Sequence, residues 1–162
     1  MGDIKMTIDT KAMLKFNATL AACGGVPKKV ATKAAGKGAT VVRRAIRRFV
    51  PVDTGALKRG IVRDGERTKF QGKKVYDLMF DPGMNDIFQK PIKNRGEFGG
   101  KKPWAYYPAS MEYGFLTRSK GGGYDYVPGY HFMREAAEFN EDAAKQAMME
   151  TFTAEMVKEW TK

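Results

Sequence analysis

The 162-residue chain has little of the chemistry on which most enzymes depend. It has one cysteine, Cys23, and one histidine, His131. A zinc site needs about four Cys, His, Asp or Glu ligands at suitable spacing, and no such cluster is present. A lone cysteine cannot form an internal disulfide, so we expect synthesis in a reducing cytoplasm. We predict no metal site and no cofactor, and we expect His131 to pack or cap at the start of the last helix.

The catalytic arrangements that the sequence partly matches are also incomplete. The two serines, Ser110 and Ser119, lie in no Gly-x-Ser-x-Gly elbow. The tripeptide Asp53-Thr54-Gly55 also occurs in aspartic proteases, but those enzymes need two carboxylates that share one proton. This chain has no second copy of the tripeptide, and a basic helical segment leads into the one it has. The sequence therefore predicts a protein without catalytic residues.

Long apolar runs are absent as well. No stretch of eighteen apolar residues occurs, so we predict no membrane-spanning helix. Residues 1–5 lack the charged start and apolar stretch of a signal peptide. Hydrophobic residues make up 43% of the chain, enough for a core. At this length we expect one domain over residues 1–162.

Positive charge is the main feature that the composition does have. The formal net charge is +11 at pH 7, which predicts acidic partners or polyanions. Most of it lies between Pro27 and Arg63, where Asp53 is the only acid, whereas the last helical segment is rich in acids. Copies of the chain could therefore pair head to tail, as in contacts that close into rings; the alternative is two solvated faces. The eleven basic residues of the segment are Lys28, Lys29, Lys33, Lys37, Arg43, Arg44, Arg47, Arg48, Lys58, Arg59 and Arg63.

Helical periodicity predicts two long helices. Apolar residues recur at helical spacing from Pro27 to Phe49. Pro51 disfavours helical geometry in the residue before it, so this helix should end at about Phe49. A second pattern runs from about Tyr130 to Trp160 as one helix with a continuous apolar stripe.

Shorter elements complete the expected fold. We predict a strand or arm over residues 3–8 and a helix over 11–22. Alternating apolar residues predict a hairpin from strands 61–70 and 73–80, and a third strand over 104–107. The fold class is therefore α+β, with long N-terminal and C-terminal helices packed on a small antiparallel sheet.

The segment after the basic helix is predicted to form a rigid corner. Asp53 is placed to be the N-cap of a short helix, with Val52 and Leu57 as the two positions of a hydrophobic staple. Gly60 fits a left-handed exit from that turn. Ile61 should then begin the first strand.

Two long loops are expected, at about residues 82–103 and 116–129. Loops of this length in a compact domain are usually functional. They contain Phe88, Phe98, Tyr124 and Tyr126, and a loop has little reason to expose such residues unless a neighbouring molecule covers them. We expect both loops to contact neighbours in an assembly.

The corner also resembles a motif of a tailed-bacteriophage family. Residues 51–61 read Pro-Val-Asp-Thr-Gly-Ala-Leu-Lys-Arg-Gly-Ile, which is similar to the Pro-x-Asp-Thr-Gly-x-Leu-x-x-Ser-Ile signature of small minor tail-component, neck and tail-completion proteins. Glu112-Tyr113-Gly114 resembles the family's Glu-Tyr-Gly, and residues 127–136 resemble its Pro-x-x-Phe-Leu-x-x-Ala motif at the start of the last helix. Gly60 stands where the family has Ser. The corner residues that carry the resemblance are Pro51, Asp53, Thr54, Gly55 and Leu57.

The resemblance implies a structural virion protein at the head–tail junction, made in the bacterial host. Such a protein would form a ring, with six- or twelve-fold symmetry, between the head connector and the tail tube. It would join or complete the tail and leave a conduit for DNA. One alternative is a tail terminator that caps the tube. Another, from a different class, is a protein that binds nucleic acid through phosphates without base readout.

Charge also predicts which residues meet at subunit boundaries. A conduit must let DNA slide, so we expect only a minority of the basic residues to face its lumen. Arginine pairs bidentately with carboxylates, which predicts that most of the arginines in the helix lie at protein–protein contacts. The expected contact residues are Arg43, Arg44, Arg47 and Arg48, with Glu138, Glu141 and Asp142 as partners.

Overall fold

The computed structural model of the chain describes residues 26–67, 73–92 and 104–161. The strand expected over 3–8, the helix over 11–22 and Phe98 lie outside the described residues. The described elements, in chain order, are α2 (Lys28–Phe49), α3 (Ala56–Gly60), β1 (Ile61–Gly65), β2 (Tyr76–Phe80), η1 (Pro82–Met84), α4 (Asn85–Phe88), β3 (Gln89–Pro91), β4 (Trp104–Tyr106), α5 (Tyr107–Tyr113), β5 (Gly114–Arg118), β6 (Tyr124–Pro128), α6 (Phe132–Phe139) and α7 (Glu141–Trp160).

The first long helix has the ends that the prolines predicted. Pro27 is the N-cap residue of α2, and its carbonyl accepts hydrogen bonds from Val30 and Ala31. Phe49 is the last helical residue, and Val50 is extended, as the ring of the following proline requires. The predicted helix is therefore confirmed within one residue at its start.

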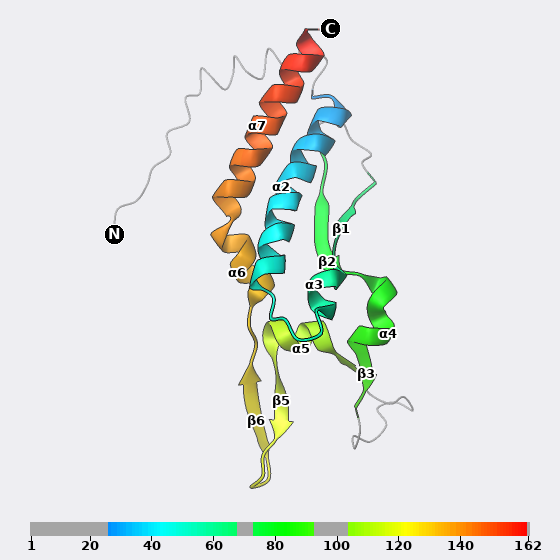
Figure 1. Cartoon of the computed structure of the whole chain (residues 1–162), viewed down its shortest axis with the longest axis vertical. Helices are drawn as coiled ribbons and strands as arrows, with labels where there is room; N and C mark the ends of the chain where they lie inside the picture. The colour runs from blue at the N-terminus through cyan, green and yellow to red at the C-terminus, as the bar shows by residue number, and fades with distance from the viewer. Residues whose placement is uncertain (1–25, 68–72, 93–103, 162) are drawn as a thin grey trace, which may run out of the picture.

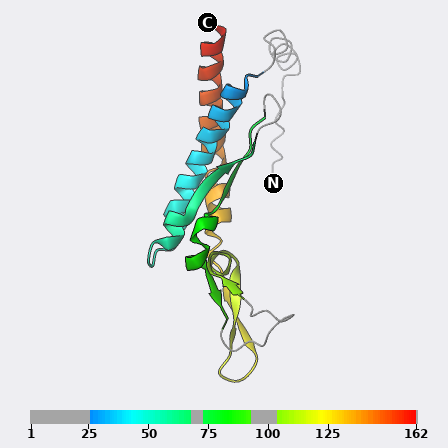
Figure 2. The ribbon, with the colours of Figure 1, turned by 90° about the vertical axis from the view of Figure 1, so that its right-hand side faces the viewer.

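Helix α7 packs along one side of α2, and the hairpin of β1 and β2 packs along the other (Figures 1 and 2). A glycine makes the helix–helix contact close. A Cβ atom on Gly38 would lie 2.5 Å from Cγ and Sδ of Met148. Lys33 of α2 and Glu155 of α7 form an ion pair across the same contact. Gly38 therefore leaves room for Met148 of α7.

The β1–β2 hairpin is shorter than the sequence predicted. Its antiparallel register runs from Ile61 opposite Phe80 to Gly65 opposite Tyr76. In β2, Tyr76, Leu78 and Phe80 share the more buried face, as the alternation predicted. The Arg63 guanidinium donates to the Gly36 carbonyl at 2.7 Å and lies over the Tyr76 ring, so it ties the hairpin to α2.

One buried cluster lies where α2, the corner, α4 and α6 meet. Phe88 is fully buried at its centre. Its ring makes edge-on contacts with Phe80 and Tyr106, with centroids 5.6 and 6.2 Å away. The expectation that Phe88 sits in an interaction loop is therefore wrong. Residues 82–88 instead form η1 and α4, which fold back to bring Phe88 into the core.

The C-terminal helix is broken, which corrects the expectation of one continuous helix with one stripe. Asn140 ends α6 with its side chain donating to the Ala136 carbonyl at 2.9 Å, and α7 begins at the next residue. The break shifts the buried face, because Ala144 and Met156 are buried while Ala143 and Phe139 are exposed.

The second expected loop is also wrong, because residues 114–128 form a regular hairpin of β5 and β6. The strands of the described chain form three separate two-stranded antiparallel sheets rather than one. The α+β class is confirmed. In Figures 1 and 2 the β5–β6 hairpin extends from the end of the molecule opposite the C-terminus.

Candidate functional site

The corner is the turn and short helix α3 that join α2 to β1, and its residues act differently from the sequence prediction. Gly55 is the N-cap residue of α3 with φ of 73°, the left-handed region that glycine tolerates. Asp53 makes no cap hydrogen bond and Val52 is 65% exposed, so the expected cap and staple are both wrong. Leu57 is 3% exposed, as expected, but it is buried in the central cluster. Thr54 accepts a hydrogen bond from the Ala56 amide at 3.4 Å.

Gly60 is needed for a reason other than the predicted left-handed exit. Among the described residues, positive φ angles occur at other positions and not at Gly60. A Cβ atom on Gly60 would lie 2.5 Å from Cζ of Phe88. The glycine that stands in the place of the family's Ser therefore lets the Phe88 ring reach the backbone of the corner.

Two of the three motifs that carry the family resemblance meet at the start of α6. Glu112 is 4% exposed, and its carboxylate accepts hydrogen bonds from the amides of Met133 at 2.9 Å and Arg134 at 3.2 Å. These are unsatisfied donors of the first helical turn, where a negative charge is favourable. The N-cap residue of α6, His131, makes no side-chain cap bond and has φ of 50°. Glu112 therefore replaces the local cap.

Sequence reasoning missed this role of Glu112. The available signal was the start of the last helix, which offers no Ser, Thr, Asp or Asn at its N-cap. His131 was expected to pack or cap, and its backbone carbonyl accepts from the Glu135 amide at 2.9 Å. The contribution of His131 to capping is made by its backbone.

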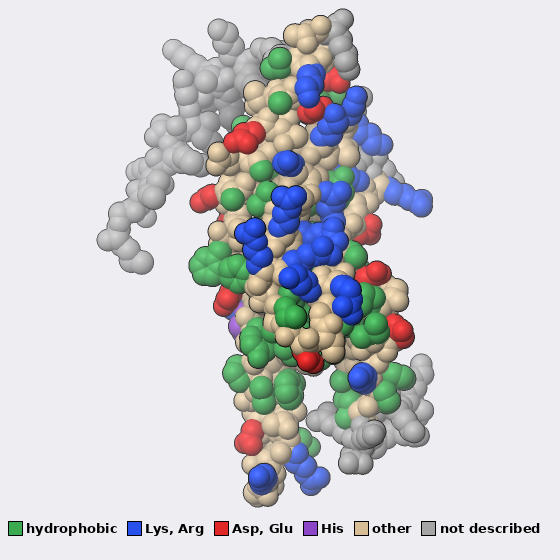
Figure 3. All heavy atoms as spheres, in the orientation of Figure 1, with side chains coloured by type: hydrophobic (Ala, Val, Ile, Leu, Met, Phe, Trp, Pro, Cys, Tyr) green, Lys and Arg blue, Asp and Glu red, His purple; other side chains and the backbone are tan. Residues whose placement is uncertain are grey.

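Lysines and arginines form a continuous band over α2 and the adjoining hairpin (Figure 3). Two of the four predicted contact arginines are structural. Arg43 Nε donates to the Ile61 carbonyl at 2.9 Å, and Arg47 Nη2 donates to the same oxygen at 3.3 Å. Burial, then the neighbouring Arg47 and Arg63, lowers the pKa of Arg43. Arg43 and Arg47 hold the start of β1 against α2.

Arg44 and Arg48 are different, because both are exposed. Across the described ranges, no acid forms an ion pair with either of them. The three predicted acidic partners, Glu138, Glu141 and Asp142, are exposed on α6 and α7. Glu141 already pairs with Lys145 one turn later, at 2.6 Å. The chain therefore does not bring the acids and arginines together, and pairing between copies stays a prediction.

The β5–β6 hairpin is the least supported element of the described chain. Phe115 is 46% exposed, Leu116 60% and Tyr126 59%. All ten strand residues except Gly114 are exposed. The Tyr126 hydroxyl donates to the Tyr113 carbonyl at 2.6 Å, which fixes the base of the hairpin on α5. An isolated two-stranded hairpin is marginally stable in water, and in the described chain this one packs on little besides α5.

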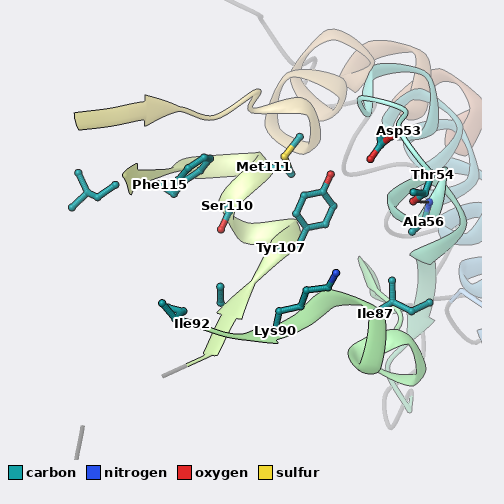
Figure 4. A pocket seen from close by; sticks show the side chains of 12 residues that line it. Asp53, Thr54, Ala56, Ile87, Lys90, Ile92, Tyr107, Ser110, Met111 and Phe115 are labelled. Atoms are coloured by element: carbon teal, nitrogen blue, oxygen red, sulfur yellow. Dashed lines mark hydrogen bonds between the residues drawn. The ribbon is translucent and has the colours of Figure 1, made fainter. Parts of the chain in front are cut away.

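A groove lies between this hairpin, the corner and β3, with a volume of about 980 Å³ (Figure 4). Its walls are mainly apolar and aromatic. Asp53 stands on the corner side and Lys90 on the β3 side. The lining residues are Asp53, Thr54, Ala56, Ile87, Lys90, Ile92, Ala105, Tyr107, Ser110, Met111, Phe115 and Leu116.

The groove offers little catalytic chemistry within the described ranges. Ser110 is its hydroxyl nucleophile candidate, and that hydroxyl donates to the Tyr106 carbonyl at 3.4 Å rather than to a base. No group of three or more His, Cys, Asp or Glu that could hold a metal occurs in the part of the chain that the structure describes. No helix in that part is long and apolar enough to cross a membrane.

Comparisons with protein-family models, with curated proteins and with solved structures found no match to this chain.

Proposed function

We propose that the protein is a non-catalytic structural subunit of a phage virion that forms a ring at the head–tail junction and leaves a conduit for DNA. The observation that carries this proposal is the projecting β5–β6 hairpin. It exposes Phe115, Leu116 and Tyr126 and packs on little besides α5. An assembly subunit has a reason to keep such an element, because a neighbour covers it.

Two further observations support the same role. The phage-like motifs are structural here, because Leu57 is in the core and Glu112 caps α6. Arg44 and Arg48 are exposed on α2, while Glu138 and Asp142 are exposed on α6 and α7. Unlike charges on separate surfaces of one chain favour heterologous contacts between copies.

Sedimentation velocity of the full chain over a range of concentrations tests the proposal. We expect oligomers for the unmodified chain and monomers for the double variant Phe115→Ser/Leu116→Ser, with the circular dichroism spectrum unchanged. Met149→Ser is the matched control, because Met149 is 64% exposed on α7, away from the hairpin. If the hairpin variant sediments like the control, the hairpin is not the assembly element.

A second function, sequence-independent binding of nucleic acid, is favoured by the basic band over α2. Phosphate contacts make affinity fall steeply with salt. Binding of a duplex DNA of random sequence, measured from low to physiological salt, separates the two roles. Tight binding by a monomer, lost in Arg44→Glu/Arg48→Glu, would support this function over the ring. Assembly without tight DNA binding would support the ring.

A further inference from the structure

The groove and the hairpin lie at the same end of the molecule, which allows one to receive the other from a second copy. The hairpin extends from the end opposite the C-terminus (Figures 1 and 2), and the residues that line the groove belong to elements at its base, including β3, α5 and β5. In a ring whose rotation axis is parallel to the long axis of the molecule, the hairpin of one copy would therefore lie at the same level along that axis as the groove of the next copy. The groove is also hollowed beside the hairpin, since Phe115 and Leu116 form part of its wall.

We propose that the groove is the receiving site for the β5–β6 hairpin of a neighbouring copy. This inference rests on the proposed ring and names the contact that closes it. The apolar lining of the groove would cover exposed residues on both faces of the incoming hairpin: Phe115 and Val127 on one face, and Leu116 and Tyr126 on the other. Such a contact uses different surfaces on the two copies, and contacts of that kind generate rings when the rotation closes.

The hairpin carries charges of opposite sign on its two faces. Residues opposite one another in an antiparallel ladder point to the same face. In the hairpin, Asp125 is opposite Thr117, while Arg118 belongs to the other face, with Leu116 and Tyr126. One face therefore carries an acid and the other a base.

The groove has the complementary arrangement. Lys90 stands on the β3 wall and Asp53 on the corner wall (Figure 4). Within the described ranges neither is in an ion pair. A hairpin inserted between these walls would place Asp125 towards Lys90 and Arg118 towards Asp53. This match selects a second hairpin over an uncharged apolar ligand as the occupant.

Disulfide trapping between two variants of the full chain tests the contact. Both variants carry Cys23→Ser, and each has one introduced cysteine. One chain carries Ile87→Cys in the groove and the other Thr117→Cys on the hairpin face that carries Asp125. The control replaces Thr117→Cys with Met149→Cys, an exposed position on α7. We expect at least about tenfold more covalent dimer from the hairpin pair than from the control pair.

Equal yields from the two pairs would overturn the inference. If oligomers form but the hairpin pair gives no cross-link, the hairpin–groove contact is overturned, while the proposed ring is kept with another partner for the groove. If the chain is monomeric and gives no cross-link, both the contact and the ring are overturned. As a second readout, Arg118→Asp should weaken assembly at least about tenfold, and adding Asp53→Arg in the same chain should restore it. Failure of that restoration in a folded double variant would also count against the contact.

Discussion

Glu112 shows how one buried charge joins two distant parts of the chain. Its carboxylate accepts from two amides at the start of α6, so it satisfies donors that the local sequence leaves open. Asp53, the residue that sequence reasoning placed in a capping role, is exposed and makes no cap bond. The physical difference is burial, which decides what each carboxylate contributes to stability.

Glu112→Ala should therefore lower the free energy of unfolding by about 1–3 kcal/mol, because the amides of Met133 and Arg134 lose their acceptor. Asp53→Ala should change it by less than about 0.5 kcal/mol, as for an ordinary surface position. Urea denaturation of both variants measures the difference. A larger loss for Asp53→Ala than for Glu112→Ala would return the capping role to the corner.

Gly60 is a second residue whose role depends on a distant side chain. Gly60→Ala should destabilise the chain by about 1–3 kcal/mol, because the new methyl group would press on the buried Phe88 ring. Gly121→Ala is the control, since nothing lies within 4 Å of a Cβ placed there, and it should be nearly neutral. Thermal denaturation compares the two, and equal melting temperatures would show that Phe88 can move aside.

Among the elements, those bounded by local signals were predictable from sequence. Pro27 and Pro51 bracket α2, and the start of β1 at Ile61 was predicted correctly. The break at Asn140 and the short helix α4 were missed. Both depend on tertiary contacts. The buried residues of α6 and α7 do not form one continuous stripe, and α4 places Phe88 in the buried cluster. The β5–β6 hairpin was not predicted, because its strands are joined by a five-residue connection, residues 119–123, rather than by a two-residue turn.

The contact between α2 and α7 should depend on pH through Glu155. Hydrogen bonds from Lys33 and then Lys158 lower the pKa of Glu155 to about 2. A carboxylate with a lowered pKa stabilises the folded state above its unfolded value near 4.5, and that stabilisation is lost as pH falls towards 2. Melting temperatures of the unmodified chain and Glu155→Gln should therefore differ at pH 6 and converge near pH 2. A constant difference across this range would show that the ion pair contributes nothing.

The basic face of α2 gives a prediction about assembly. Arg44→Glu/Arg48→Glu should block assembly and leave the subunit folded, because both side chains are exposed and unpaired within the described chain. Lys28→Glu/Lys29→Glu makes the same change in charge at exposed positions at the start of α2 and should assemble normally. Sedimentation of both variants is the measurement. Virions with normal tails and altered DNA ejection in the arginine variant would instead place Arg44 and Arg48 in the lumen.

At the scale of the whole molecule, the chain has a packed body and an apolar hairpin that the body does not cover. The body contains the buried cluster around Phe88, to which α2 contributes Ala45 and Ile46, and α7 packs along α2 (Figure 1). We propose that a second molecule covers the hairpin and fills the groove beside it. A ring accounts for both, because each subunit would cover the hairpin of its neighbour and present its own to the next.

Native mass spectrometry of the assembled full-length chain tests this central claim most directly. A closed ring gives one discrete mass, and the account predicts six or twelve copies that fall to one copy in Phe115→Ser/Leu116→Ser. A monomer at every concentration, or a ladder of open oligomers without a preferred number, would contradict it.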